Sequence, residues 1–237
     1  MHGEFIAEGT KLVIELLAGN FKPVALYAVK EWFNENKLTA GNKVAVNEVT
    51  DDEMARITSL TTPSPCLLIL QTRNTPFDIT IAEKELVLML DEIKDPGNLG
   101  TIIRTADWFG FKHIVCSLNT VDLYNPKTIQ STMGSIARVN VSYQNLDEIL
   151  EKMKQKVAVY GSLLDGENIL NKKLSTNGFI IIGNESKGIS DKIRNYVNEN
   201  IYIPAYHPHA EIDKPESLNA SIATAIICYE FRRSKIK

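Results

Sequence analysis

The chain has 237 residues, 44% of them hydrophobic and 23% charged, which is enough to bury one large core or two small ones. Its apolar runs, such as residues 86–90 and 179–183, are far shorter than the roughly 20 residues of a membrane-spanning helix, so no transmembrane segment is expected. The net charge of −3 gives the whole molecule no electrostatic preference for nucleic acid, so any RNA site must be a local basic surface.

The first residues and the cysteines indicate the cellular compartment. Residues 1–19 mix three glutamates into their apolar positions and contain neither a basic leader nor a small-residue cleavage site. Cys66, Cys116 and Cys228 lie far apart beside apolar residues, without the spacing of a metal site, and are expected to be reduced core residues. We therefore expect a cytoplasmic protein.

The first part of the chain is predicted to be a compact α/β unit. Its elements are, in chain order, a helix over 8–19 that ends at Gly19, an apolar strand over 23–29, a helix over 49–60 with Thr50 or Asp51 at its N-cap, and a buried strand in the proline-containing segment 62–71. Residues 72–84 are polar, contain Pro76 and have too little apolar content for a core element. We therefore place a small domain at residues 1–75 and a linker at 76–84.

The second domain, residues 85–237, alternates strands and helices. Its strands are predicted over 86–93, 113–118, 139–143, 157–164, 179–183 and 200–204, and its helices over 98–111, 125–139, 146–156 and about 217–234. Continuous apolar strands separated by amphipathic helices predict an α/β fold with a largely parallel sheet covered by helices on both faces. Ligands of such sheets usually bind beyond the carboxyl ends of the strands, so the loops there are the candidate sites.

The first candidate loop opens the helix over 98–111. The residues from Asp95 to Asn98 predict a turn, Gly100 permits a close approach of the backbone, and Arg104 follows near the start of the helix. A guanidinium at this place can grip a phosphate. The alternative is a turn and a capped helix with a surface arginine, which the spacing alone slightly favours.

The second candidate loop follows the fifth strand of this domain. Glu185 and Lys187 lie between Gly183 and Gly188, which have the spacing of a phosphate loop, but Ile189 stands where the phosphate-binding lysine belongs. Nucleotide triphosphate hydrolysis is therefore disfavoured, and the chain has no GxGxxG dinucleotide motif. The alternative for this segment is a tight turn with both charged side chains in water.

The third candidate segment leads from the strand over 200–204 to the last helix. Ser217 and Asn219 are both preferred N-cap residues, so capping is the alternative to a functional role for either. His207 and His209 lie near acidic residues, but their spacing matches no zinc pattern, and we expect a solvent loop without a metal.

In this order and at these separations, the three segments resemble the three motifs of the SpoU/TrmH family of RNA 2'-O-ribose methyltransferases. The matching residues are Asn98-x-Gly100-x-x-x-Arg104, then Gly183-Asn184-Glu185 with Gly188, then Ile203-Pro204 leading to Ser217-Leu218-Asn219-Ala220-Ser221. The resemblance implies a catalytic domain with a deep trefoil knot, preceded over residues 4–71 by a small ribosomal-protein-like domain that binds the substrate. It also implies a homodimer whose active site draws on both chains.

The resemblance further implies S-adenosylmethionine as the cofactor, held against the knot loops largely by backbone groups. By resemblance, the cofactor lies near Leu163, Gly183, Asn184, Ile203, Pro204 and Leu218. The family's functional positions correspond to Asn98, Arg104, Glu185, Ser217 and Asn219.

The implied chemistry is a direct displacement, in which a ribose 2'-hydroxyl attacks the methyl group of the sulfonium and no metal takes part. Because a guanidinium seldom gives up its proton, the main role expected of Arg104 is to position phosphate and ribose, and in a dimer it is expected to serve the cofactor of the partner chain. Glu185 and Asn219 are expected to orient Arg104 and the ribose, and Ser217 is expected to help shape the site.

One segment departs from the family pattern. Residues 205–216 are longer and more acidic than the short glycine-containing link that family members commonly have there, so their cover of the cofactor pocket is expected to differ.

The resemblance leaves alternatives for the substrate and for activity. Ribosomal RNA is the preferred substrate, because N-terminal domains of this kind are more often associated with it, and transfer RNA is the alternative. An RNA-binding module without methyl transfer is a second alternative, against which the presence of Arg104, Glu185 and Asn219 argues. A nucleotide-dependent oxidoreductase or hydrolase is disfavoured because its fingerprints are missing.

Overall fold

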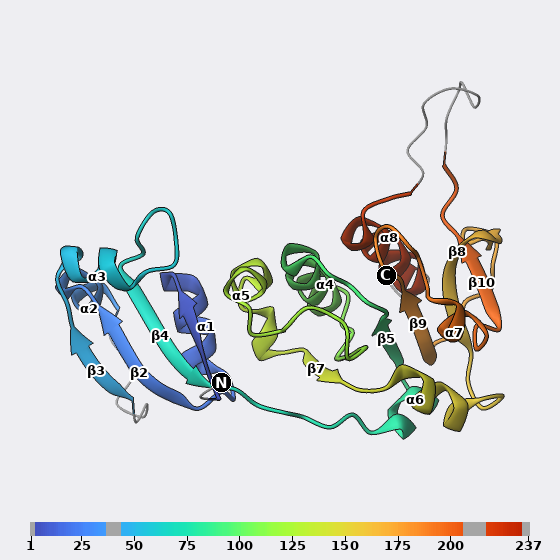
Figure 1. The fold of residues 1–237 in the computed structure, drawn as a ribbon, viewed down its shortest axis with the longest axis horizontal. Helices are drawn as coiled ribbons and strands as arrows, with labels where there is room; N and C mark the ends of the chain where they lie inside the picture. The colour runs from blue at the N-terminus through green and yellow to red at the C-terminus, as the bar shows by residue number, and fades with distance from the viewer. Residues whose placement is uncertain (1–2, 37–43, 206–216, 234–237) are drawn as a thin grey trace.

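The computed structural model describes residues 3–36, 44–205 and 217–233. In these residues the chain forms two β-sheets, which stand side by side in Figure 1 and are joined by an extended segment between β4 and β5. The strands are β1 (Glu4–Glu8), β2 (Pro23–Ala28), β3 (Ala45–Glu48), β4 (Cys66–Gln71), β5 (Leu86–Leu90), β6 (His113–Cys116), β7 (Asn140–Tyr143), β8 (Val159–Asn168), β9 (Gly178–Ile182) and β10 (Glu199–Tyr202). The helices are α1 (Thr10–Ala18), α2 (Lys30–Glu35), α3 (Asp51–Ile57), α4 (Pro96–Trp108), α5 (Pro126–Thr132), α6 (Leu146–Met153), α7 (Asp191–Arg194) and α8 (Ala220–Arg233), with 3-10 turns η1 (Ile79–Glu83) and η2 (Ser135–Ala137).

The N-terminal sheet has the order β1-β4-β2-β3 within the described residues, with β4 antiparallel to β1 and β2, and β3 parallel to β2. As predicted, Gly19 terminates α1, as its C-cap, and of the two predicted caps it is Thr50 that caps α3, by accepting a hydrogen bond from the backbone N–H of Glu53. The carboxylate of Glu53 in turn accepts from the backbone N–H of Thr50, which completes a capping box. The prediction did not separate β1 from α1, because a strand of five residues offers little periodicity.

The C-terminal sheet has the order β10-β8-β9-β5-β6-β7, and its neighbouring strands within the described residues are all parallel, as predicted. Alternate residues of β5 enter two different cores. Leu88 packs in the core shared with α4, α5 and α8, whereas Val87 and Met89 pack in the core shared with α6, α7 and η1. Helices therefore cover both faces, which explains why all five positions of β5 are apolar and buried.

The order of the strands reverses between β5 and β9, and this place is the topological switch point of the sheet. From β5 the chain proceeds to β6 and β7 on one side, whereas β9, β8 and β10 lie on the other. A parallel sheet with such a reversal opens a crevice at the carboxyl ends of its strands. Helix α8 follows the edge strand β10 but packs against α4, so the end of the chain returns toward the centre of the sheet (Figure 1).

Two differences from the predicted helices have a clear local cause. The helix predicted over 125–139 divides into α5 and η2, because Met133 (φ 50°) and Gly134 (φ 93°) adopt the left-handed conformation. The last helix begins at Ala220, three residues after the predicted start, because Asn219 and not Ser217 provides its cap.

The segment between the sheets also differs from the prediction. Phe77 and Ala82 are buried in the core on the α6 side of the C-terminal sheet, so the expectation that residues 72–84 form no core element is wrong. Cys66, Cys116 and Cys228 are buried and free, as predicted. Within the described part of the chain, no helix is both long and apolar enough to cross a membrane.

Candidate active site

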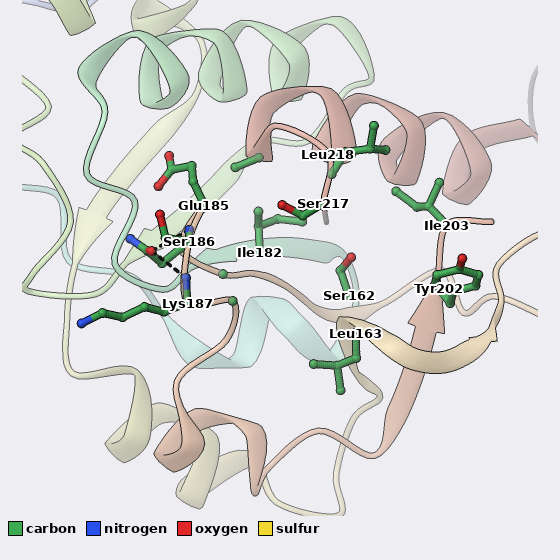
Figure 2. Close-up of a pocket in the computed structure, with 15 residues that line it drawn as sticks. Ser162, Leu163, Ile182, Glu185, Ser186, Lys187, Tyr202, Ile203, Ser217 and Leu218 are labelled. Atoms are coloured by element: carbon green, nitrogen blue, oxygen red, sulfur yellow. Dashed lines mark hydrogen bonds between the residues drawn. The ribbon is translucent and has the colours of Figure 1, made fainter. Parts of the chain in front are cut away.

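A pocket of about 510 Å³ lies beside the switch point, within the range of about 300–1,000 Å³ that is usual for small-molecule sites. Its walls come from β8, from the loop after β9, and from the end of β10 together with the start of α8 (Figure 2). The lining residues are Ser162, Leu163, Ile182, Gly183, Asn184, Glu185, Ser186, Lys187, Gly188, Tyr202, Ile203, Ser217, Leu218, Ala220 and Ala223.

One wall of the pocket is the amide loop, residues 183–188. Asn184 and Gly188 close this loop, because each backbone N–H donates to the carbonyl of the other at 2.9 Å. The Oδ1 atom of Asn184 also accepts from two N–H groups within the loop, at 2.9 and 3.0 Å. A side chain at Gly183 has no room, since a Cβ there would lie 2.2 Å from the carbonyl carbon of Gly188. Close backbone contacts therefore determine the shape of this wall.

Glu92 connects the amide loop to the loops after β5 and β6. Its backbone is left-handed (φ 58°), which is uncommon for a residue other than glycine. Its carbonyl accepts from Asn184 Nδ2 at 2.9 Å, and its N–H donates to Ser117 Oγ at 2.9 Å. Its carboxylate accepts from Asn119 Nδ2 at 3.1 Å. Three loops at the carboxyl end of the sheet are thus joined at one residue.

Three predicted site residues, Asn219, Asn98 and Glu185, form a hydrogen-bonded row beside the pocket, here called the polar chain. Oδ1 of Asn219 accepts from the backbone N–H of Ser221 at 2.9 Å, and its Nδ2 donates to Asn98 Oδ1 at 3.0 Å. Nδ2 of Asn98 then donates to Glu185 Oε1 at 2.8 Å. Because a backbone N–H can only donate, it determines the orientation of both amides, and the donors point toward the Glu185 carboxylate.

The start of α4 is capped by Asp95, in line with the alternative of a capped helix for this segment. Asp95 Oδ1 accepts from the backbone N–H of Asn98 at 2.8 Å, and this bond, together with Lys127 at 3.2 Å, holds the pKa of Asp95 below its usual range. Gly100 serves helix packing, because a Cβ there would lie 2.4 Å from the Cβ of Ser131 on α5. The close approach expected at Gly100 is therefore made by a neighbouring helix.

Arg104 is not brought into this arrangement. Its side chain is exposed on α4, does not line the pocket, and has no hydrogen bond or ion pair with another residue that the structure describes. Trp108, one turn further along the helix, is 83% exposed. The expected contact of Glu185 and Asn219 with Arg104 is therefore not made within the described residues of one chain.

Most predicted cofactor residues meet at the pocket, namely Leu163, Gly183, Asn184, Ile203 and Leu218, together with Glu185 and Ser217 from the predicted catalytic set. Pro204 is not among the described lining residues. Sequence reasoning missed Ser162 and Tyr202, although Tyr202 lies toward the carboxyl end of a strand predicted over 200–204 and that position is itself a signal.

The structure describes Ala205 but not the rest of the segment 205–216, so the predicted difference in its cover of the pocket, and the residues His207 and His209, lie outside the described residues. In the part of the chain that is described, no group of three or more His, Cys, Asp or Glu side chains is arranged to hold a metal ion.

The pocket suits a cofactor that combines a flat apolar ring with polar, charged groups. Leu163, Ile203 and Leu218 offer apolar surface, and the amide loop offers backbone groups because Gly183 leaves no side chain over it. A parallel sheet with this pocket beside its switch point and the polar chain at the pocket edge is the arrangement that the resemblance to RNA 2'-O-ribose methyltransferases implies.

The chain belongs to the SpoU rRNA methylase family, whose family model matches residues 85–229. Residues 1–67 match the model of an MRM3-like substrate binding domain. The chain is 30% identical to the 23S rRNA (guanosine(2553)-2'-O)-methyltransferase RlmP of Bacillus subtilis, over 96% of this chain and 88% of that protein.

Solved structures show the same relationship. A proposed RNA methyltransferase of the TrmH family from Porphyromonas gingivalis superposes with a TM-score of 0.86 and 33% identity, covering 98% of this chain and 90% of that one. An rRNA methyltransferase from Sinorhizobium meliloti bound to S-adenosylmethionine superposes with a TM-score of 0.84 and 29% identity, covering 99% and 89%. The predicted family and the predicted cofactor are confirmed.

Proposed function

We propose that this protein methylates a ribose 2'-hydroxyl of ribosomal RNA. The observation that carries the proposal is the polar chain, whose donors converge on Glu185 at the edge of the pocket. The relative from Bacillus subtilis is named for this reaction on 23S rRNA and matches nearly the whole chain, which supports ribosomal RNA over transfer RNA. We assign RNA binding to residues 1–75, in line with the substrate-binding model that matches there.

We assign the cofactor to the space between the amide loop and the apolar side chains of Leu163, Ile203 and Leu218. Backbone groups of the amide loop would bind the polar edge of the adenosine, and Pro204 would bound the pocket beyond Ile203. When bound, S-adenosylmethionine would supply a methyl group on a positively charged sulfur. Transfer of this methyl group to the ribose oxygen leaves S-adenosylhomocysteine, whose sulfur is neutral.

The residues around the pocket hold the ribose and its proton. Asn98 occupies Oε1 of Glu185, which leaves Oε2 to accept a hydrogen bond from the 2'-hydroxyl and then its proton as the new carbon–oxygen bond forms. Asn219 fixes the orientation of Asn98, and Ser217 bounds the pocket on the side of α8. Holding the hydroxyl in line with the methyl group can contribute about 7–11 kcal/mol to catalysis.

We propose that a homodimer supplies Arg104 to the site of the partner chain, where its fork binds the RNA phosphate. The exposed face of α4 that carries Arg104 also carries Trp108, and the adjoining α8 exposes Ile222 (53%) and Tyr229 (45%). An exposed apolar surface of this kind is typical of an interface, and a two-fold axis would apply it to both chains. The variant Trp108→Glu is expected to be monomeric in analytical ultracentrifugation, whereas the wild type is expected to be a dimer.

We also propose the trefoil knot that the resemblance implies. Two facts support it: the pocket combines the loop after β9 with the segment before α8, and α8 returns from the sheet edge to pack on α4.

The proposed function is tested with labelled S-adenosylmethionine and two substrates, deproteinised ribosomal RNA and transfer RNA. After alkaline hydrolysis, a 2'-O-methyl group protects the next phosphodiester, so labelled resistant dinucleotides are expected from ribosomal RNA. Resistant dinucleotides from transfer RNA alone would contradict the proposed substrate. Calorimetric binding of S-adenosylhomocysteine without transfer to either RNA would indicate an RNA-binding module instead.

A further inference from the structure

The N-terminal unit (β1–β4 with α1–α3) packs against the catalytic unit (β5–β10 with α4–α8). Ion pairs of Arg138, which follows η2, join the two units, and this bridge is here called the clamp. The guanidinium of Arg138 binds Glu15 of α1 (Nη1 to Oε2, 2.9 Å) and Asp107 of α4 (Nε and Nη2 to Oδ2, both 2.8 Å). The two carboxylates lie on different units, so one side chain bridges them. These bonds raise the pKa of Arg138, so its guanidinium keeps its charge.

A second contact lies at the start of the segment that joins the units. The hydroxyl of Tyr124 donates to the carbonyl of Arg73 at 2.7 Å and accepts from its N–H at 2.9 Å. The guanidinium of Arg73 lies 4.2 Å from the ring centre of Phe21 and donates to the carbonyl of Ile136 at 3.2 Å. The Tyr124 ring also contacts Phe5, at 4.8 Å between centres. The joining segment is therefore bound to both units where it leaves β4.

Between these contacts, the two units lie so close that backbone groups and small residues of one touch the other. Gln130 Nε2 on α5 donates to the carbonyl of Glu8 at the end of β1, at 3.1 Å. A Cβ at Gly134 would collide with the Glu15 carboxylate, and a Cβ at Gly19 would lie 3.1 Å from the Cβ of Ala137. One continuous core of buried apolar residues runs through both units. The contact is thus a packed interface with polar bonds at its edge.

The solved relative from Porphyromonas gingivalis supports a fixed arrangement. In a TM-score, each superposed residue contributes at most one to an average over the chain. Residues 76–237 are 162 of the 237 residues, so a superposition of this unit alone could reach a TM-score of at most about 0.68. The observed score is 0.86 over 98% of the chain, so the N-terminal unit superposes together with the catalytic unit. Two chains with 33% identity therefore hold their units in the same relation.

We propose that Arg138 is a specificity-determining residue that holds the RNA-binding unit at a fixed distance from the pocket, so that this distance selects the nucleotide to be methylated. The inference rests on the proposed function. If the N-terminal unit is held rigidly, only the nucleotide at one fixed distance from the RNA element that it binds reaches the pocket. If it is held loosely, nucleotides at several distances can reach the pocket. Arg138 is not among the described residues that line the pocket, and we assign it a role through the placement of the other unit.

The first test is a disulfide staple across the interface, Gly19→Cys with Ala137→Cys. The Cβ separation of 3.1 Å is just below the roughly 3.5–4.5 Å of natural disulfides, and the three native cysteines are buried. Under oxidation, the stapled protein is expected to methylate the same nucleotide of ribosomal RNA at the wild-type rate. Loss of methylation on oxidation, with recovery after reduction, would overturn the proposal, because it would show that the units must separate during turnover.

The second test reverses the charge of the clamp with Arg138→Glu, which places three carboxylates together. The site of methylation in ribosomal RNA is expected to spread to further nucleotides, and kcat/KM for the original one to fall about tenfold, with KM for S-adenosylmethionine unchanged. The double variant Arg138→Glu with Glu15→Arg restores an ion pair between the units and is expected to recover the single site.

The matched control is Lys112→Glu, which applies the same charge change to an exposed ion pair with Glu85 (3.2 Å) within the catalytic unit. It is expected to keep the wild-type site. An unchanged site in Arg138→Glu, or a spread site in Lys112→Glu, would contradict the assignment to Arg138.

A readout without RNA separates this inference from the proposed function. By small-angle X-ray scattering, the wild type and the oxidised staple are expected to have the same radius of gyration, and Arg138→Glu a larger one. A larger radius of gyration for the wild type than for the staple would show that the two units are not held at a fixed distance. It would overturn the proposal, whatever the RNA results. Absence of methylation of every RNA by the wild type would reject the proposed function alone.

Discussion

The amide loop and the exposed face of α4 both carry residues of the predicted site, but they differ in the number of hydrogen bonds that hold those residues in place. The amide loop is closed on itself by the pair Asn184 and Gly188 and is bound to the loop after β5 through Glu92. Arg104 on α4, in contrast, has no partner among the described residues of its own chain. The loop proposed to bind the cofactor is therefore held in place by its own chain, whereas the side chain proposed to bind RNA has no such contact among the described residues.

This difference indicates how the site is completed. A preformed loop binds its ligand with little loss of conformational entropy, and so favours binding of the cofactor by the free protein. Under the proposed function, a guanidinium with no partner among the described residues of its own chain is available for an RNA phosphate, and RNA and the partner chain together position it. Variants in the two regions are therefore expected to affect different quantities.

The largest effect is expected at Arg104. In Arg104→Ala the rate of methyl transfer should fall by about 10²–10³-fold, because a charged group that positions the reacting centre is lost. The dissociation constant of S-adenosylhomocysteine, measured by calorimetry, should stay within about twofold, because the role proposed for Arg104 is to bind the RNA phosphate. Arg104→Lys should be intermediate, since it keeps the charge but loses the fork. Unchanged transfer in Arg104→Ala would remove the residue from the site.

The second largest effect is expected in the preformed region. Gly183→Val should raise the dissociation constant of S-adenosylhomocysteine by about 100-fold, because the side chain would separate Gly183 from Gly188 and open the loop. Gly110→Ala is the matched control, since Gly110 is a left-handed glycine (φ 68°) with open space around it. The control should lower the melting temperature slightly and leave the affinity unchanged. Equal affinities in both variants would show that the amide loop does not bind the cofactor.

A smaller effect is expected where the two regions meet, at the polar chain. Asn98→Leu removes the hydrogen bond to Glu185 and the acceptor for Asn219, and should lower kcat about tenfold, since a bond to a charged group contributes about 1.5 kcal/mol or more. Binding of S-adenosylhomocysteine should change less than twofold, because Asn98 lies outside the described pocket lining. Single-turnover kinetics measure the first quantity and calorimetry the second. A change confined to binding would contradict the role given to Asn98.

The smallest effect is expected at Glu92. A β-branched residue disfavours the left-handed backbone by about 1–2 kcal/mol, so Glu92→Val should weaken binding of S-adenosylhomocysteine about fivefold through Asn184. Glu92→Gly adopts the same backbone freely and should bind within about twofold of the wild type. If the two variants bound equally, the backbone of Glu92 would have no part in shaping the amide loop.

The parallel sheet followed from the sequence because its strands are short apolar runs separated by amphipathic helices. The cap at Thr50 and the end of α1 at Gly19 were equally predictable, since each depends on residues within one turn. The break between α5 and η2 was not, because Met133 adopts a left-handed backbone that local preference disfavours.

The site was predictable as a set of residues but not as an arrangement. The resemblance named Asn98, Glu185 and Asn219, and the alternative of helix capping at Asn219 proved compatible with a site role, since its oxygen caps α8 while its amide nitrogen binds Asn98. No local signal reveals that Glu92 joins three loops, because its partners lie 25, 27 and 92 residues away. Contacts of that separation depend on the order of strands in the sheet.

The bond between Asn219 and Asn98 has a consequence for the synthesis of the protein. The two residues are 121 positions apart, and a ribosome that adds about 5–20 residues per second needs about 6–24 s to pass from one to the other. During this interval the nascent chain already carries the complete N-terminal unit, but it lacks the helix that closes the pocket and the amide that orients Asn98. Under the proposed function, a growing chain can therefore encounter RNA before its polar chain is complete, which happens only after Asn219 has been made.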